Sequence, residues 1–212
     1  DPIKEFDFLG ITIQYEMCYT NILQVLDLSG IPLLAKDRID QDPIVIGGGP
    51  CTYNPEPIAD FFDIFYIGEG ETRYRELIDL YKECKKRCSR QDFLRKAACI
   101  PGMYVPSLYE VTYHEDGTIA ERKKLVPEIP DVIHKELVCD VSETYYPEKP
   151  VVPFIKVTQD RVVLEIQRGC IRGCRFCQAG QLYRPVRERS LAYLEDKAIK
   201  LLKNTGHEEI SL

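Results

Sequence analysis

Three closely spaced cysteines, Cys170, Cys174 and Cys177, are the residues of this chain whose type and spacing best suit metal chemistry. They lie in the stretch RGCIRGCRFCQ, residues 168–178, with the spacing Cys-x3-Cys-x2-Cys. Thiolates bind iron–sulfur clusters, and a cubane cluster is normally held by four of them. Three thiolates would leave one iron free to bind a substrate or cofactor. The spacing therefore predicts a cluster site with one open coordination position.

Spacing alone leaves two alternatives open for these cysteines. A zinc site usually pairs its cysteines and needs a fourth ligand, often a histidine. The chain has three histidines, none of which belongs to a His-x3-5-His pair: His114, His134 and His207. Cys174 and Cys177 could instead form a Cys-x-x-Cys redox pair, which would leave Cys170 unexplained. The alternative to an enzyme is therefore a non-catalytic zinc- or thiol-based structural module.

The segments on either side of the cysteines predict a strand, a loop and a helix. Residues 161–167 form a largely apolar run, which predicts a buried strand leading into the loop. Gly169 and Gly173 are expected to let the loop wrap a cluster and to direct backbone N–H groups at its sulfurs. Ser190 is expected to cap a helix that ends near Gly206.

This pattern, with Phe176 directly before the last cysteine, resembles the signature of the radical S-adenosylmethionine (SAM) superfamily. The resemblance implies that Cys170, Cys174 and Cys177 hold a [4Fe-4S] cluster whose free iron is chelated by the amine and carboxylate of SAM. It implies that an electron from the reduced cluster cleaves SAM to methionine and a 5′-deoxyadenosyl radical, which abstracts hydrogen from an unidentified substrate. It also implies a place beside the SAM adenine for Phe176, and an external electron donor such as flavodoxin or ferredoxin.

The first hundred residues alternate strand-like and helix-like segments. The expected strands cover residues 8–13, 43–46 and 64–67, and the expected helices cover residues 20–28, 55–62 and 74–88. Strands that alternate with helices predict a parallel sheet with covered faces. We therefore expect an α/β fold with a partial doubly wound parallel sheet.

Glycines follow two of these strands, and ligands of open α/β sheets bind beyond the carboxyl ends of strands. The segments Gly48-Gly49-Pro50, Pro55-Glu56 and Gly68-Glu69-Gly70-Glu71 resemble a cobalamin-binding-type domain, which precedes many radical SAM domains. The Asp-x-His-x-x-Gly motif that supplies the cobalt ligand in such domains does not occur here, so cobalamin is not supported. The alternative is a structural α/β module whose glycines permit tight turns.

The remaining residues predict two further parts. Residues 101–150 contain a hairpin signal around Asp116-Gly117, followed by a proline-rich linker. Residues 151–212 hold only the first βα unit of the partial (β/α) barrel that the resemblance implies, and residues 209–212 begin its next strand. With residues 1–100 as the first part, we expect an internal fragment of a longer protein that is not active by itself.

Bulk composition narrows the class of protein. The chain has 212 residues, of which 44% are hydrophobic and 29% are charged, as in ordinary globular proteins. No apolar run is long enough to span a membrane, and the first residues lack a secretion signal. Nine cysteines without a disulfide framework indicate a reducing cytoplasm. The net charge of −6 argues against general nucleic-acid binding by the whole chain.

The charge near the cysteines has the opposite sign. Seven arginines lie within residues 161–190: Arg161, Arg168, Arg172, Arg175, Arg184, Arg187 and Arg189. Only Glu165 and Glu188 oppose them there. The arginines could offset the charge of an anionic cluster and of the SAM carboxylate, and they permit a nucleotide or RNA substrate. The alternative is that most of them are solvated or pair with local acids, where surface charges contribute little.

Overall fold

The computed structural model describes all residues from Asp1 to Leu212 and divides them into two compact units, Asp1–Leu137 and Val138–Leu212. The predicted hairpin belongs to the first unit, and the cysteines belong to the second. The three-part division at residues 100 and 150 stays a prediction.

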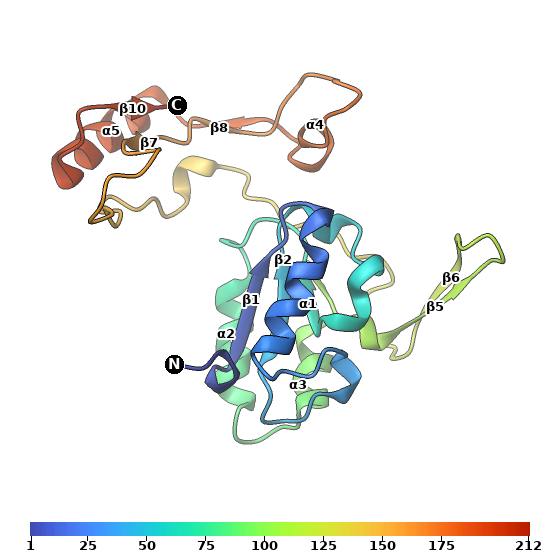
Figure 1. Ribbon diagram of the computed structural model, residues 1–212. Helices are drawn as coiled ribbons and strands as arrows, with labels where there is room; N and C mark the ends of the chain where they lie inside the picture. Colours follow the sequence, from blue (N-terminus) through green and yellow to red (C-terminus); the bar gives the residue numbers. More distant parts are fainter. The chain divides into compact units, whose positions relative to one another are not determined.

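The first unit is built on a four-stranded sheet in the order β1-β2-β3-β4 (Figure 1). Its strands are β1 (Phe8–Thr12), β2 (Ile44–Gly48), β3 (Ile64–Tyr66) and β4 (Met103–Tyr104). The first three are parallel, which confirms the predicted α/β class, whereas β4 runs antiparallel to β3 and was not predicted. Ile44, Val45 and Ile46 are all buried, as expected for a central strand covered on both faces.

Three helices accompany this sheet: α1 (Tyr19–Leu28), α2 (Tyr74–Cys84) and α3 (Arg90–Ala97). We expected α2 to continue to Cys88, but it ends at Cys84 because a separate helix starts just afterwards. Ser89 caps α3 with its Oγ, which accepts from the backbone N of Asp92 at 3.2 Å, and the Asp92 carboxylate accepts in return from the Ser89 N at 3.3 Å. This reciprocal capping box sets the start of α3.

The helix expected over residues 55–62 is not an α-helix. It is the 3-10 helix η5 (Glu56–Phe61), with non-helical backbone angles at Ile58. Pro57 lies in its first turn, where proline is tolerated, and the irregular backbone falls at the next residue, Ile58. The element is therefore short and kinked.

A buried ion network ties the sheet to the segments around it. Asp63, directly before β3, places its Oδ2 2.9 Å from Nη1 of Arg38 and 2.7 Å from Nη2 of Arg90. The same oxygen accepts from the backbone N of Val45 in β2 at 2.7 Å. The side chains of Asp63, Arg38 and Arg90 are 1%, 0% and 5% exposed. Because buried charges need such partners, this network joins the start of α3 to the middle of the sheet.

The predicted hairpin is confirmed. Strands β5 (Tyr109–Tyr113) and β6 (Ile119–Lys124) pair antiparallel, and Figure 1 shows them projecting from the first unit. Gly117 in the turn has a φ of +82°, which a residue with a Cβ rarely adopts.

The second unit contains one parallel strand pair and one antiparallel pair. Strands β7 (Val162–Val163) and β10 (Ile210–Ser211) are parallel, and the helix α5 (Leu191–Thr205) lies between them in the sequence. Ser190 caps α5 by accepting from the Tyr193 N, and Gly206 ends it with a φ of +76°. The predicted helix and the first βα unit are therefore confirmed.

The prediction of a single buried strand over residues 161–167 is wrong. That stretch contributes to two short strands in different sheets: β7, and β8 (Gln167–Arg168), which pairs antiparallel with β9 (Arg187–Glu188). Val162 and Leu164 are buried, but Val163 is 61% exposed and Ile166 is 37% exposed. The run therefore has one buried apolar face, formed by Val162 and Leu164, and its Glu165 makes the polar contacts described below.

Candidate cluster-binding loop

The three cysteines lie on a loop that is closed at its base by the β8–β9 pair. Gln167 is paired with Glu188 and Arg168 with Arg187, so residues 169–186 leave and return at the same point (Figure 1). The short helix α4 (Ala179–Leu182) forms the returning part. The loop is therefore an excursion from a two-stranded ladder, not the simple end of a buried strand.

All three thiols are free, and none is buried. Cys170 is half-buried, while Cys174 and Cys177 are exposed. The backbone N of Cys177 donates to the carbonyl of Cys174 at 3.1 Å, so these two residues share a tight turn. The Sγ of Cys170 accepts from the backbone N of Arg172 at 3.4 Å. Nevertheless, no group of three His, Cys, Asp or Glu side chains in this structure is arranged to hold a metal ion.

The glycines of the loop differ in what they do. Gly169 has a φ of +92°, and a Cβ there would lie 2.5 Å from the carbonyl oxygen of Tyr183. A Cβ on Gly180 would lie 2.8 Å from the carbonyl oxygen of Arg172. Gly173 has neither a positive φ nor a neighbour within 4 Å of a built Cβ. Gly169 and Gly180 therefore let the two sides of the loop approach, and the wrapping role expected of Gly173 stays a prediction.

A buried arginine and a carboxylate hold the base of the loop. Oε2 of Glu165 lies 2.5 Å from Nη2 of Arg189, and Oε1 of Glu165 lies 2.8 Å from Nε of Arg168. The guanidinium of Arg189 also lies 5.1 Å from the ring centroid of Tyr146 and 5.2 Å from that of Tyr193. Such cation–π contacts add to the ion pair where the arginine is desolvated. We call Glu165, Arg168 and Arg189 the loop clamp.

The loop clamp also changes the acid–base behaviour of its carboxylate. Burial raises the pKa of Glu165, but the hydrogen bonds and charges of Arg168 and Arg189 outweigh it and hold the pKa below its ordinary value. Glu165 therefore stays ionised where its partners need a negative charge. In the sequence Glu165 stands out only as a counter-charge, because no local pattern marks a contact between residues 24 positions apart.

The seven arginines divide into structural and exposed groups. Arg187 is buried and donates to the carbonyl oxygens of Val138, at 2.8 Å, and of Pro185, at 3.1 Å. Together with Arg168 and Arg189, it supports the alternative that these charges serve local contacts. Arg172 and Arg175 lie within the cysteine loop itself and are exposed. Phe176, expected beside the SAM adenine, is also exposed, at 93%.

The carboxyl end of the sheet in the first unit is filled by the chain itself. Gly49 has a φ of +93°, and a Cβ there would lie 2.9 Å from the carbonyl oxygen of Ile13. Gly68 has a φ of +129° and forms a parallel bridge with Glu136, whose carbonyl oxygen would lie 2.3 Å from a Cβ. Backbone packing therefore accounts for both glycines, which supports the structural alternative over a ligand cradle.

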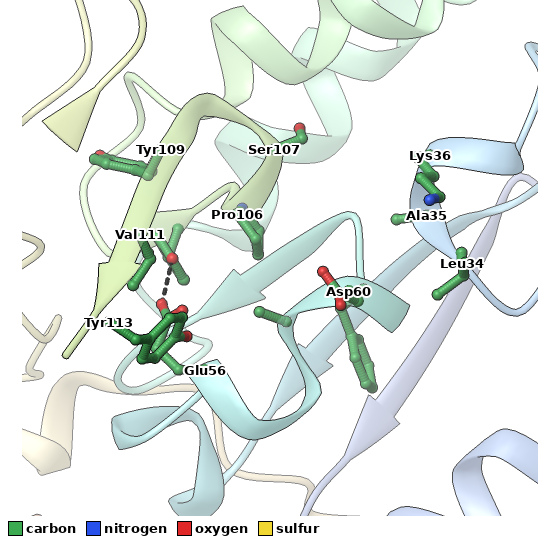
Figure 2. Close-up of a pocket in the computed structure, with 13 residues that line it drawn as sticks. Leu34, Ala35, Lys36, Glu56, Asp60, Pro106, Ser107, Tyr109, Val111 and Tyr113 are labelled. Atoms are coloured by element: carbon green, nitrogen blue, oxygen red, sulfur yellow. Dashed lines mark hydrogen bonds between the residues drawn. The ribbon is translucent and has the colours of Figure 1, made fainter. Parts of the chain in front are cut away.

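A cavity of about 420 Å³ lies elsewhere in the first unit. Figure 2 shows Leu34, Ala35 and Lys36 on one side and residues of β5 on the other. The hydroxyl of Tyr104 donates to the Glu56 carboxylate in this cavity at 2.5 Å, and burial followed by this contact raises the pKa of Tyr104. No cysteine or histidine lines the cavity, so it offers no soft metal ligand.

Comparison with known proteins identifies the family. The model of a family described as radical SAM proteins, N-terminal, matches residues 1–106, which is half of the 212 residues. The chain therefore belongs to the radical SAM proteins, as its cysteine pattern predicted. It is 32% identical over 209 residues to the uncharacterized protein MJ0966 of Methanocaldococcus jannaschii. That alignment covers 96% of this chain and 37% of the relative, so the chain spans little more than a third of the relative's length.

None of the helices has the length and apolar character needed to cross a lipid bilayer. The cytoplasmic location and the external electron donor stay predictions.

Proposed function

We propose that Cys170, Cys174 and Cys177 hold a [4Fe-4S] cluster that binds SAM, and that the whole protein is a radical SAM enzyme. The family membership supports this proposal, and one feature of the chain carries it: the three free thiols lie on a single loop with a closed base. The chemistry that such a cluster supplies when bound is the one-electron reductive cleavage of SAM, which starts hydrogen abstraction from a substrate.

The donor set fits a cluster better than it fits a structural zinc ion. Three thiols lie within eight residues of one loop, and none of the three histidines lies in that loop to supply the fourth ligand that a zinc site needs. Because the sulfurs are exposed or half-buried, and none is committed to a disulfide, they can move together as a cluster assembles. Assembly would then order the loop, since metal binding and folding are coupled at sites that are not preformed.

The backbone and the exposed side chains of the loop would complete the site. The backbone N–H of Arg172 already points at the sulfur of Cys170, and hydrogen bonds to sulfur are among the factors that set a cluster's reduction potential. Arg172 and Arg175 would reduce the net negative charge around the cluster and the SAM carboxylate. Phe176 is exposed and free to lie against the adenine.

Anaerobic reconstitution with iron and sulfide tests the proposal. We expect a brown protein with a broad absorbance band near ~400 nm, as thiolate-bound clusters give. Cys174→Ala should remove the band and bound iron, whereas Cys139→Ala, which changes an exposed cysteine outside the loop, should keep both. A variant with all three loop cysteines replaced that still assembles the cluster would refute the assignment.

Metal analysis distinguishes the cluster site from the structural alternative. The zinc- or thiol-based module predicts stoichiometric zinc in anaerobically purified protein and no iron after reconstitution. SAM binding should be measured on the longer protein, because the present chain covers only part of the length of its relative.

A further inference from the structure

A second thiol site lies in the first unit, where two cysteines share one lysine. Cys84 is the last residue of α2 and is 2% exposed, while Cys88 is half-buried. The backbone N of Cys88 donates to the carbonyl of Cys84 at 2.9 Å, so the two residues are one helical turn apart. Nζ of Lys96, from α3, lies 3.5 Å from Sγ of Cys88 and 3.9 Å from Sγ of Cys84.

The spacing of the two cysteines suits a disulfide. One helical turn places their Cα atoms about 6 Å apart, which is within the range that disulfides span. Burial, followed by the neighbouring Cys88, raises the pKa of Cys84, and the Lys96 ammonium lies nearer to Cys88. Because Cys88 is the more accessible thiol and Cys84 lies behind it, an incoming molecule meets Cys88 first.

Two cavities open on this pair. One of about 410 Å³ is lined by Cys84, Cys88, Lys85 and Lys86, and one of about 460 Å³ is lined by Cys88, Arg95 and Lys96. Lys85 is paired with Asp7, but Lys86 and Arg95 form no ion pair. The acids that line these cavities are Asp40, Asp42, Asp92 and Glu128, of which Asp92 is used in the cap of α3. Lys86, Arg95 and Lys96 therefore place positive charge beside Cys88, which favours an anionic ligand.

We propose that Cys84 and Cys88 form a redox-active dithiol that reacts with small anionic disulfides of the glutathione class. The Cys88 thiolate attacks one sulfur of the disulfide, forms a mixed disulfide and releases one thiolate. The Cys84 thiolate then attacks Sγ of Cys88, which forms the Cys84–Cys88 bond and releases the second thiolate. The protein loses two electrons and two protons, and the small disulfide is reduced to two thiols.

The experiment uses oxidised glutathione under anaerobic conditions, followed by peptide mass spectrometry. It is done on the 212-residue chain with Cys170, Cys174 and Cys177 replaced by Ala, so its outcome is independent of any cluster. We expect a Cys84–Cys88 disulfide, formed faster than any adduct at Cys139, an exposed thiol that lines neither cavity. In the Cys84→Ala variant, Cys88 should accumulate as the glutathione adduct.

Replacing Lys96 tests its role directly. Lys96→Met should slow the reaction of Cys88 roughly tenfold, because it removes the cation that lies 3.5 Å from the attacking sulfur. Lys82→Met, which changes an exposed lysine paired with Asp79, should leave the rate unchanged. The proposal is overturned if Cys88 reacts no faster than Cys139, or if Lys96→Met and Lys82→Met behave alike. Circular dichroism of each variant confirms that slow reaction does not reflect unfolding.

Discussion

The Glu165 carboxylate and the Arg189 guanidinium meet at 2.5 Å although 24 positions separate them in the sequence. Glu165 lies just before β8, and Arg189 lies just after β9. The contact therefore joins the residue that leads into the cysteine loop to the residue that leads out of it. It works with the β8–β9 ladder to fix where the loop begins and ends.

Replacing Glu165, the acid of the loop clamp, should loosen the point where the cysteine loop begins and ends. Glu165→Gln leaves the Arg189 guanidinium buried without its counter-charge, so we expect a loss of about 2 kcal/mol in the stability of the second unit. Hydrogen exchange read by mass spectrometry should show faster exchange at β8 and β9. Glu195→Gln changes an exposed glutamate on α5 and serves as the matched control. Equal exchange in both variants would contradict a clamping role.

The same carboxylate should make the second unit sensitive to acid. The folded protein holds the pKa of Glu165 below its ordinary value of 4.5, so the stabilisation is fully present above pH 4.5 and is lost as the pH falls below it. Exchange rates at β8 should therefore rise as the pH is lowered through this region, after correction for the intrinsic rates. In Glu165→Gln this added pH dependence should disappear, and its persistence would assign it to another group.

Gly169 and Gly173 of the cysteine loop should respond differently to substitution. Gly169→Ala places a Cβ in a left-handed backbone and against the Tyr183 carbonyl, so we expect a cost above the ~1–2 kcal/mol of the backbone term alone. Reconstituted iron should fall in this variant, because the loop can no longer close. Gly173→Ala meets nothing within 4 Å and should bind iron as the parent does. A loss of iron in Gly173→Ala would show that the assembled loop needs that glycine as well.

The buried network around Asp63 should dominate the stability of the first unit. Asp63→Asn leaves the Arg38 and Arg90 guanidiniums without their shared counter-charge, and breaking a buried pair in this way costs about 3–5 kcal/mol. Urea unfolding followed by circular dichroism measures the change. Asp60→Asn, an exposed acid on η5, is the control and should shift the midpoint little. Similar midpoints for the two variants would rule out the network as a main support.

Buried tyrosines should make the first unit sensitive to alkali. Burial raises the pKa of Tyr66 to about 12 and that of Tyr81 to about 12, above the ordinary value of 10. A raised folded pKa means that the stabilisation is fully present below pH 10 and is lost as the pH rises towards 12. Tyrosinate absorbance should therefore show a late class among the 13 tyrosines, released together with loss of circular dichroism. A single titration near pH 10 with the fold intact would contradict this prediction.

Elements with a complete local pattern could be predicted from the sequence. Ser190 and Gly206 mark both ends of α5, and Asp116-Gly117 marks the β5–β6 turn. β2 and β3 appear as short apolar runs, which suit strands buried on both faces. In each case the residues that determine the element lie within it or beside it.

Elements that depend on distant partners could not be predicted. β4 has two residues and exists because Met103 and Tyr104 pair with Tyr66 and Phe65 of β3. The run from Arg161 to Gln167 looked like one strand because its apolar content hides a change of partner between β7 and β8. Pairing of this kind depends on tertiary context more than on local preference.

The cysteine ligands of the candidate site could be predicted from the sequence, but the contacts that hold their loop in place could not. Cysteine spacing identifies Cys170, Cys174 and Cys177 without any structure, since the ligand type and interval are local properties. The contact between Glu165 and Arg189 and the packing of Gly169 against Tyr183 join residues that no short motif connects. The sequence also left Cys84 and Cys88 among the scattered cysteines, although their four-residue interval on a helical pattern brings the two thiols to one face.

Glu136 joins the last residues of the first unit to its sheet. Its carbonyl accepts from the Glu69 N at 3.0 Å and its own N donates to the Ile67 carbonyl at 3.0 Å, one residue before the first unit ends at Leu137. These two backbone hydrogen bonds hold the last residues of the first unit against the residues that follow β3. Detaching this segment would expose the Gly68 backbone to solvent. The last residues of the first unit therefore also cover the end of its sheet.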